Sequence, residues 1–315
     1  MLKSVALYDG VLEAEKVLPG KVVQLKNETG RGTITGHAIF PGIELIYNDL
    51  HMEYCQKEGQ GKPNLLEINY CREGRCECAF TKRCYCYMSA GDLALCLLEK
   101  NNHASIFPTG HYHGITVALD FSAMSEEWQA LFSRTFAVDC RAIRQFSESK
   151  PYHIVRANDM IHHIFTELYA YQSQFRLDYA RIKIIELLLF IKDLAKEDCP
   201  DRQYFSSDQV ATVRQVRDYM VASLDRHETI EALASRFHMS PTLLKKCFRE
   251  MYGTSIYDYW RTYRLQYSEK LLREGQLSIA EIADRVGYKN PNKYSSAFRS
   301  VYGLSPSQFR KCPNG

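Results

Sequence analysis

The pattern of hydrophobic and polar residues divides the chain into a strand-like first part and a helical second part. Up to residue 121, short runs rich in β-branched and aromatic residues alternate with turns that contain glycine and proline. Short strands without helices between them favour a sandwich, jelly roll or small β-barrel over a parallel α/β sheet. The predicted strands are residues 22–25, 33–40, 44–48, 65–70, 76–80, 83–88, 92–98, 105–107 and 114–121.

Beyond residue 125 the apolar residues recur at helical spacing. Residues 159–171 and 177–194 are predicted helices, and residues 182–191 of the second are apolar on most of the helix circumference. Such a helix must be buried on more than one side. We therefore expect one side to pack on the β-domain and the other to form a homodimer interface. An intramolecular core helix is the alternative.

A polar linker at residues 196–207 precedes a C-terminal part that is helical throughout. The sequence thus predicts a multi-domain protein in three parts. They are a β-barrel domain at residues 1–150, a helical dimerisation segment at residues 151–200 and an all-α domain at residues 207–312.

A short pattern in the all-α part occurs twice. The segment Leu233–Phe237 returns 49 residues later as Ile282–Val286, whereas the second half of the pattern, which ends in Tyr-Gly, returns after 50 residues. The second copy therefore has one extra residue in its turn. Each copy predicts a helix, a tight turn and a second helix, the shape that places a helix in the major groove of DNA.

The ends of these helices are marked in the sequence. In each copy an N-cap residue followed by proline begins the second helix, and a glycine ends it. These positions are Ser240-Pro241 and Gly253 in the first copy and Asn290-Pro291 and Gly303 in the second. Residues 255–274 predict a connecting helix of about 30 Å, close to one turn of B-DNA. We expect two recognition helices in successive major grooves.

Together the two copies and the connecting helix form a longer pattern. Its residues include Leu233-Ala234, Met239-Ser240-Pro241, Cys247-Phe248-Arg249, Tyr252-Gly253, Arg264-Leu265, Glu281-Ile282-Ala283, Val286-Gly287-Tyr288, Ala297-Phe298-Arg299, Tyr302-Gly303, Ser305-Pro306 and Phe309-Arg310. In this spacing the last hundred or so positions resemble the AraC/XylS family of bacterial transcription regulators.

The resemblance implies an architecture and a function for the whole chain. The architecture is a cupin-like effector-binding barrel, dimerisation helices and a double helix-turn-helix domain. The implied function is an effector-responsive, sequence-specific DNA-binding regulator of transcription, more commonly an activator that contacts RNA polymerase than a repressor. Its expected partners are double-stranded DNA, a small-molecule effector and a second copy of the chain, and no cofactor is expected.

The polar face of each second helix supplies the candidates for DNA contact. Lysine can donate to guanine, the threonine methyl can touch a thymine methyl, and arginine at the far end of the helix suits a phosphate. The polar faces give Thr242, Lys245, Lys246, Arg249, Asn292, Lys293, Ser296 and Arg299, and the resemblance adds Ser295. A merely solvated helix face is the alternative.

The distribution of charge agrees with this assignment. The formal net charge of the 315 residues is only +3. Residues 201–315, however, hold 18 Lys and Arg against 12 Asp and Glu, whereas residues 1–200 carry a net negative charge. The positive field therefore lies on the part with the repeated pattern, as contacts to phosphates require.

A probable hairpin carries two Cys-x-Cys pairs, Cys76 with Cys78 and Cys84 with Cys86. A three-residue loop would set Cys86 opposite Cys78 and give one face with four sulfurs. A two-residue loop would set Cys84 opposite Thr81 and send the pairs to opposite faces. Four thiolates could hold zinc or cuprous ion, so a thiol-based metal or redox sensor is an alternative function. Small buried hydrophobic residues are the favoured interpretation.

Aromatic and histidine residues of the β-domain are candidates for a ligand pocket, because an aromatic body with a polar tip suits an amphipathic small molecule. The candidates are Tyr47, Tyr70, Tyr87, His111 and His113. Metal-binding cupins use a histidine pair like the last two, but the glutamate and second histidine of that motif are missing. We therefore favour a pocket or surface role over a metal site and over a cupin enzyme with a DNA-binding domain.

Targeting signals are not evident in the sequence. The first ten residues lack the apolar run of a signal peptide, and no segment approaches about 18 uncharged apolar residues. We expect a non-enzymatic protein of the cytoplasm without a membrane segment, and we interpret the 11 cysteines as reduced thiols. The effector, the operator and the regulated genes are not identified by the sequence.

Overall fold

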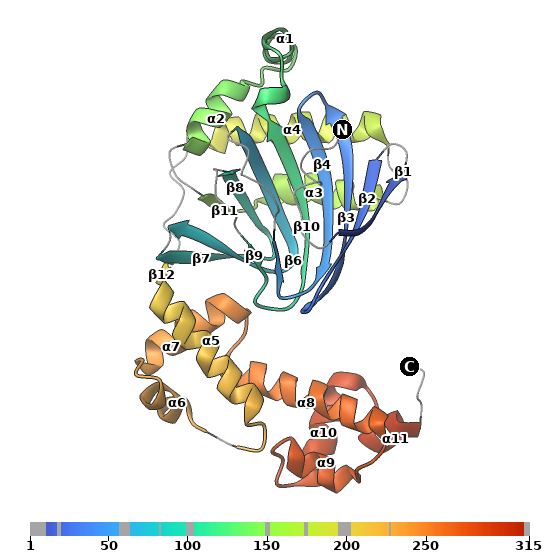
Figure 1. The fold of residues 1–315 in the computed structure, drawn as a ribbon, viewed down its shortest axis with the longest axis vertical. Helices are drawn as coiled ribbons and strands as arrows, with labels where there is room; N and C mark the ends of the chain where they lie inside the picture. The colour runs from blue at the N-terminus through green and yellow to red at the C-terminus, as the bar shows by residue number, and fades with distance from the viewer. Residues whose placement is uncertain are drawn as a thin grey trace. The chain divides into compact units, whose positions relative to one another are not determined.

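The computed structural model of the chain describes residues 11–17, 20–56, 64–81, 83–98, 104–148, 152–172, 176–194, 203–226 and 228–311. The chain forms two compact units (Figure 1), residues 1–204 (unit 1) and residues 205–315 (unit 2). Each unit is described by itself below.

Unit 1 is built on an antiparallel sheet. Its strands are β1 (Val11–Val17), β2 (Gly20–Asn27), β3 (Gly30–Phe40), β4 (Ile43–His51), β5 (Tyr54–Cys55), β6 (Leu65–Thr81), β7 (Cys84–Ser89), β8 (Asp92–Leu98), β9 (Ser105–Ile106), β10 (Tyr112–Asp120) and β11 (Tyr152–Arg156). The order along the sheet is β1-β2-β3-β4-β10-β6, and β8 and β11 continue it beyond the first half of β6.

The predicted barrel is not confirmed, because the strand order of the described residues does not return to β1 and the sheet stays open. The predicted strands are present, but two of them, residues 65–70 and 76–80, belong to the single strand β6. A register shift at Arg72 and the positive φ of Gly74 bend this strand without ending it. Its first half pairs with β8 and β10, and its second half pairs with β7 and β9.

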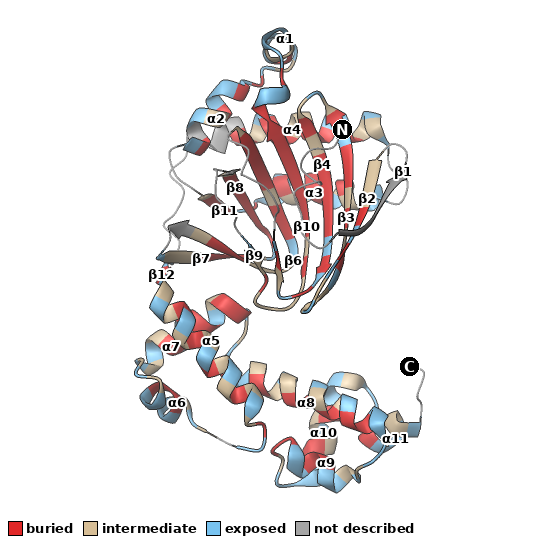
Figure 2. Cartoon of the chain, in the orientation of Figure 1, coloured by how far each residue is buried: buried red, intermediate tan, exposed pale blue. Residues whose placement is uncertain are grey.

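Side chains alternate between the two faces of the sheet, and most residues of its central strands are buried (Figure 2). On β4, Leu45 and Tyr47 belong to the core under the helices, whereas Ile46 and Leu50 belong to the core on the opposite face. The opposite face also holds Cys71, Cys78 and Cys86. We call the first of these the helix-side face.

The helix-side face is covered by α3 and α4 (Figure 1). The helical elements of unit 1 are the 3₁₀ turn η2 (Phe121–Ala123), α1 (Glu126–Phe136), α2 (Cys140–Glu148), α3 (Asp159–Ala170) and α4 (Leu177–Leu194). The Tyr47 hydroxyl donates to the Leu168 carbonyl at 2.9 Å, and the Tyr70 ring stacks on Phe165 with centroids 4.2 Å apart. The two helices predicted from the sequence, residues 159–171 and 177–194, are confirmed.

Helix α4 is buried on one side only within unit 1. Ile184, Leu187 and Leu188 are fully buried against the sheet and α3, whereas the side chain of Ile182 is 62% exposed. Leu189, seven residues further and on the same stripe, is also exposed. An apolar stripe of α4 is therefore left uncovered by unit 1.

Unit 2 is helical after the two-residue strand β12 (Phe205–Ser206). Its helices are α5 (Ser207–Ala222), α6 (Ile230–Arg236), α7 (Pro241–Tyr252), α8 (Ile256–Glu274), α9 (Ile279–Arg285), α10 (Pro291–Tyr302) and α11 (Pro306–Lys311). Apolar side chains of α8, α9, α10 and α11 form one core, which includes Leu265, Ile282 and Phe298. No described helix of the chain is long and apolar enough to cross a membrane.

Candidate nucleic-acid interface

The two copies of the repeated sequence pattern fold as α6-turn-α7 and α9-turn-α10. The predicted caps are present: the Ser240 hydroxyl accepts from the Leu243 amide at 3.3 Å, and the Asn290 side chain accepts from the Asn292 amide at 2.8 Å. Gly253 and Gly303 end α7 and α10 in the left-handed conformation. Because each cap satisfies backbone groups that the helix leaves unpaired, both second helices start and stop at defined residues.

The turns of the two copies differ by one residue, as the changing offset of the repeat predicts. Four residues lie between Arg236, the last of α6, and Pro241, whereas five lie between Arg285 and Pro291. Both turns contain one left-handed residue, His238 in the first copy and Gly287 in the second. The two turns therefore reverse the chain in the same way at the same point, and the extra residue comes after it.

Helix α7 presents a polar face to solvent. Leu244, Cys247 and Phe248 are fully buried on its inner side. Its predicted DNA-binding residues Thr242, Lys245, Lys246 and Arg249 are all exposed. Since the inner side of α7 is buried in the core, its two lysines and its arginine lie on the exposed side of a packed helix.

Helix α10 repeats this arrangement. Tyr294 and Phe298 are fully buried, and their rings lie 5.9 Å apart in the core. Asn292, Lys293, Ser296 and Arg299 are exposed, and Ser295 is half-buried. The nine predicted residues thus lie on the outward sides of the two second helices, and neither helix turns its polar face inward.

Comparison with known proteins finds similar sequences for the helical part of the chain. Residues 233–312 match a family model described as a helix-turn-helix domain. The Msm operon regulatory protein of Streptococcus mutans is 34% identical over 106 residues, 34% of this chain and 38% of that protein. The transcriptional activator RhaR of Salmonella schwarzengrund is 30% identical over 117 residues, 36% of this chain and 42% of that protein. A putative AraC-like transcription regulator of Streptomyces antibioticus is 34% identical over 85 residues, 27% of this chain and 28% of that protein.

Unit 2 carries an AraC-type helix-turn-helix domain. The chain spans less than half of the length of each of these relatives. The residues that match the family model, 233–312, lie in unit 2.

An arginine inside the AraC-type domain belongs to the sequence pattern described above, but no role of its own was predicted for it. Arg264 lies on α8, is buried, and donates to the Arg226 carbonyl in the loop between α5 and α6. Its guanidinium lies over the Trp260 ring at 4.4 Å and close to Gly287 in the turn of the second copy. Burial lowers the pKa of Arg264. In the sequence, its place in the apolar stripe of a predicted helix indicates burial, but nothing indicates its partner.

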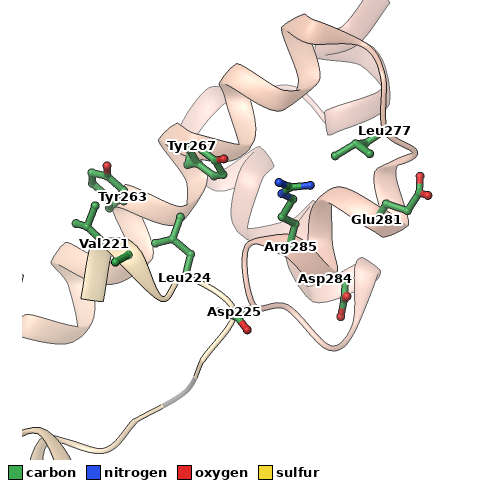
Figure 3. A pocket seen from close by; sticks show the side chains of 10 residues that line it. Val221, Leu224, Asp225, Tyr263, Tyr267, Leu277, Glu281, Asp284 and Arg285 are labelled. Carbon is green, nitrogen blue, oxygen red and sulfur yellow. The ribbon is translucent and has the colours of Figure 1, made fainter. Parts of the chain in front are cut away.

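A groove of about 690 Å³ lies within the AraC-type domain, between the end of α5, α8 and the second copy (Figure 3). Arg285 projects into it between Tyr267 and Leu277, and Glu281 and Asp284 lie at its rim. Acidic and basic groups therefore share the groove, which gives it no single charge for a ligand to match.

The five candidate ligand residues of unit 1 lie in different surroundings. Tyr47 and Tyr70 contact α3 on the helix-side face, and the Tyr87 hydroxyl donates to the Glu77 carboxylate at 2.9 Å. His111 and His113 lie close together, with ring centroids 6.1 Å apart. A cleft of about 470 Å³ lies elsewhere in unit 1, lined by Phe121, Glu126, Gln129, Cys140, Arg141, Arg144, Gln145 and Glu148.

The cysteine hairpin follows neither predicted loop alone. Cys84 lies opposite Thr81, as a two-residue loop predicts, but a register shift after Ala79 then sets Cys86 opposite Cys78. Hydrogen bonds to Cys76 and Cys86, together with burial, raise the pKa of the Cys78 thiol well above its usual range. Within the described residues these four cysteines do not form a cluster of three or more ligand atoms.

Proposed function

We propose that the chain regulates transcription by binding double-stranded DNA through α7 and α10 of its AraC-type domain. The main support for the proposal is that the two helix-turn-helix copies have the same structure. Each has a capped second helix with its apolar side buried and its polar side exposed. A helix of this kind enters a major groove with its exposed residues toward the base edges.

Charge and length support the same proposal. Residues 201–315 hold an excess of Lys and Arg, and the excess includes Lys245, Lys246 and Arg249 on the exposed side of α7. The connecting helix α8 has 19 residues and is therefore about 28 Å long, close to the about 34 Å of one turn of B-DNA. Two contacts one turn apart on the same side of a duplex fit this spacing.

Three finer parts of the proposal concern the whole chain. Unit 1 binds a small-molecule effector, for which the cleft of about 470 Å³ beside α1 and α2 is the first place to look. Two copies of the chain associate through the uncovered stripe of α4, which includes Ile182 and Leu189. The chain acts as an activator, as the transcriptional activator RhaR does, and it contacts RNA polymerase, as the family resemblance implies.

The experiment begins with selection of duplexes from a random library by the full-length chain, since the operator is unknown. Fluorescence anisotropy then measures binding of the wild type and of Lys246→Ala to a selected duplex and to a scrambled one. If Lys246 contacts a base, we expect the variant to lose about 5- to 150-fold in affinity for the selected duplex, or about 1 to 3 kcal/mol. Its affinity for scrambled DNA should change much less.

Lys270→Ala is the matched control, because Lys270 is an exposed lysine on α8, outside both second helices. It removes the same charge and should leave the affinity for the selected duplex nearly unchanged. An equal loss for Lys246→Ala on both duplexes assigns this lysine to the phosphates. If selection enriches no sequence at all, the proposal of sequence-specific binding is wrong.

A further inference from the structure

Three side chains of the types that bind metals meet at one end of the helix-side face of unit 1. Asp49 and His51 lie on β4 and His113 lies on β10. One oxygen of Asp49 lies 3.1 Å from Nε2 of His51 and 3.1 Å from Nε2 of His113, and the two Nε2 atoms are 3.3 Å apart. Among the described residues this is the one group of three or more such side chains whose ligand atoms converge.

The register of the sheet explains why these residues meet. Asp49 and His51 are two positions apart on β4, so their side chains leave the strand on the same face. His113 lies directly opposite Asp49 in the antiparallel pairing of β10 with β4. Their face is that of Tyr47 and Ile115, past the end of the apolar core. The three ligand atoms are therefore brought together by two rigid paired strands rather than by a loop.

A fourth residue, Glu73, contacts the ring of His113. Nδ1 of His113 lies 3.5 Å from a carboxylate oxygen of Glu73, which is opposite His113 on β6. In metal sites a ligating histidine commonly gives its other ring N–H to a carboxylate, and this contact fixes the ring and increases its basicity as a ligand. With the Nδ1 proton given to Glu73, Nε2 of His113 would offer its lone pair to an ion bound on the side of Asp49 and His51.

We propose that Asp49, His51 and His113 bind a divalent first-row transition metal of the Zn²⁺ class, with Glu73 orienting His113. A Zn²⁺ ion with bonds of about 2.1 Å holds tetrahedral ligand atoms about 3.4 Å apart. The three separations of 3.1, 3.1 and 3.3 Å come near this triangle before any ion is bound. Imidazole ligands suit zinc, cobalt and nickel, whereas magnesium and calcium prefer oxygen ligands.

The exposure of the cluster defines what else the ion would bind. The side chains of Asp49 and His51 are 60% and 61% exposed, and that of His113 is 28% exposed. A fourth position is therefore open to water or to a small ligand, as in zinc sites with three protein ligands. The sequence motif of metal-binding cupins does not reveal this site, because the partners of His113 come from β4 and not from its own segment.

Co²⁺ is the probe, since its absorption spectrum distinguishes nitrogen and oxygen ligands from thiolates. The full-length chain, kept reduced, is titrated with Co²⁺, and Zn²⁺ is then added in competition. We expect one Co²⁺ per chain, visible absorption without a thiolate-to-cobalt charge-transfer band, and displacement by Zn²⁺. Asp49→Ala, His51→Ala and His113→Ala should each weaken Co²⁺ binding at least about ten-fold, and Glu73→Gln about ten-fold.

His111→Ala is the matched control. His111 lies two residues before His113, but its Nδ1 contacts the Thr109 carbonyl at 3.2 Å and it is outside the converging group. This variant should bind Co²⁺ like the wild type. Thermal unfolding of each variant without metal shows that it is folded, and added Zn²⁺ should raise the melting temperature of the wild type but not of His51→Ala.

Two results would overturn the proposal. The first is a wild-type chain that binds no stoichiometric Co²⁺, which leaves Asp49 as a simple hydrogen-bond acceptor for two imidazoles. The second is Co²⁺ binding with a thiolate band that persists in His51→Ala, which moves the site to the cysteines. Neither result bears on DNA binding by the AraC-type domain, which the duplex-selection experiment tests separately.

Discussion

Gly287, in the turn of the second copy, shows how the stability of the AraC-type domain depends on one left-handed residue. Gly287 has a φ of 77°, and a Cβ placed there would lie 2.5 Å from the Leu224 carbonyl oxygen. Gly303 has a similar φ of 74°, but a Cβ there would meet nothing within 4 Å. The two glycines therefore separate the cost of the left-handed conformation from the cost of a backbone clash.

We predict that Gly287→Ala lowers the free energy of unfolding by about 2 to 4 kcal/mol, because alanine bears both costs. Gly303→Ala should lose about 1 kcal/mol, which is the conformational cost alone. Urea denaturation of the full-length chain, followed by circular dichroism, measures both. Equal losses in the two variants would mean that the turn relaxes away from Leu224.

The exposure of a single residue could be predicted from the sequence where it depends only on the helix that contains the residue. Lys246 and Asn292 could be assigned to exposed faces because a helical period fixes the side on which each residue lies. The contact of Arg264 with Arg226 and the meeting of His51 with His113 could not be predicted. Both join elements far apart in the sequence, and no local period records such a pairing.

At the scale of elements, the buried side chain of Arg264 on α8 contacts both helix-turn-helix copies. Arg264 donates to a carbonyl before α6 and lies against the turn before α10. An unbranched apolar side chain of similar length would fill the space of Arg264 but leave that carbonyl without this donor. The loss of a buried hydrogen bond to a charged group costs about 1.5 to 3 kcal/mol.

We therefore predict that Arg264→Met lowers the free energy of unfolding by about 2 kcal/mol and weakens binding to a selected duplex, because the two recognition helices lose a common support. Arg273→Met is the control on the same helix. Arg273 pairs with Glu269 at the surface, and such a pair contributes about 0 to 1 kcal/mol. Urea denaturation and anisotropy give the two readouts, and the expectation is wrong if both variants behave alike.

The elements themselves could largely be predicted from the sequence, but their assembly into a sheet could not. The caps at Ser240 and Asn290 and the period of residues 177–194 are local signals. Strand β11 (Tyr152–Arg156) was not predicted, because it follows two helices in the part of the chain whose apolar residues recur at helical spacing. A barrel closes only if strands far apart in the sequence pair with each other. The barrel was predicted from the spacing of the strands along the chain, which does not show such pairing.

At the scale of the molecule, the uncovered stripe of α4 is the feature that a single chain leaves unexplained. Large exposed apolar patches on a soluble protein commonly mark an interface. We predict that the wild-type chain sediments as a dimer and that Ile182→Asp sediments as a monomer, since a carboxylate in a closed apolar interface carries a large desolvation penalty.

Analytical ultracentrifugation at several concentrations measures this change. Leu131→Asp is the matched control, because Leu131 on α1 is 56% exposed, a fraction similar to that of Ile182. The control should remain a dimer. A wild-type chain that is monomeric at all concentrations would rule out the α4 interface in the absence of DNA and effector.

The position of the unit boundary also follows from contacts that the sequence does not display. Helices α3 and α4 were expected to form a segment of their own at residues 151–200. In the structure they pack on the sheet through Tyr47 and Tyr70, and β11 pairs with β8, so unit 1 extends to Tyr204. The sheet and these helices therefore share one hydrophobic core.

Arg72 is an extra residue in β6, at the register shift with β10, and it changes which positions of the strand face each side of the sheet. Before Arg72 the odd-numbered position Cys71 faces the core of Tyr112, whereas after it the even-numbered positions Cys76 and Cys78 do. Counting alternate positions through the strand would thus place Glu73 on the wrong side of the sheet. In an alignment of relatives of unit 1, a gap at position 72 would mark chains without this extra residue. In such chains we expect no carboxylate in the place of Glu73 beside His113.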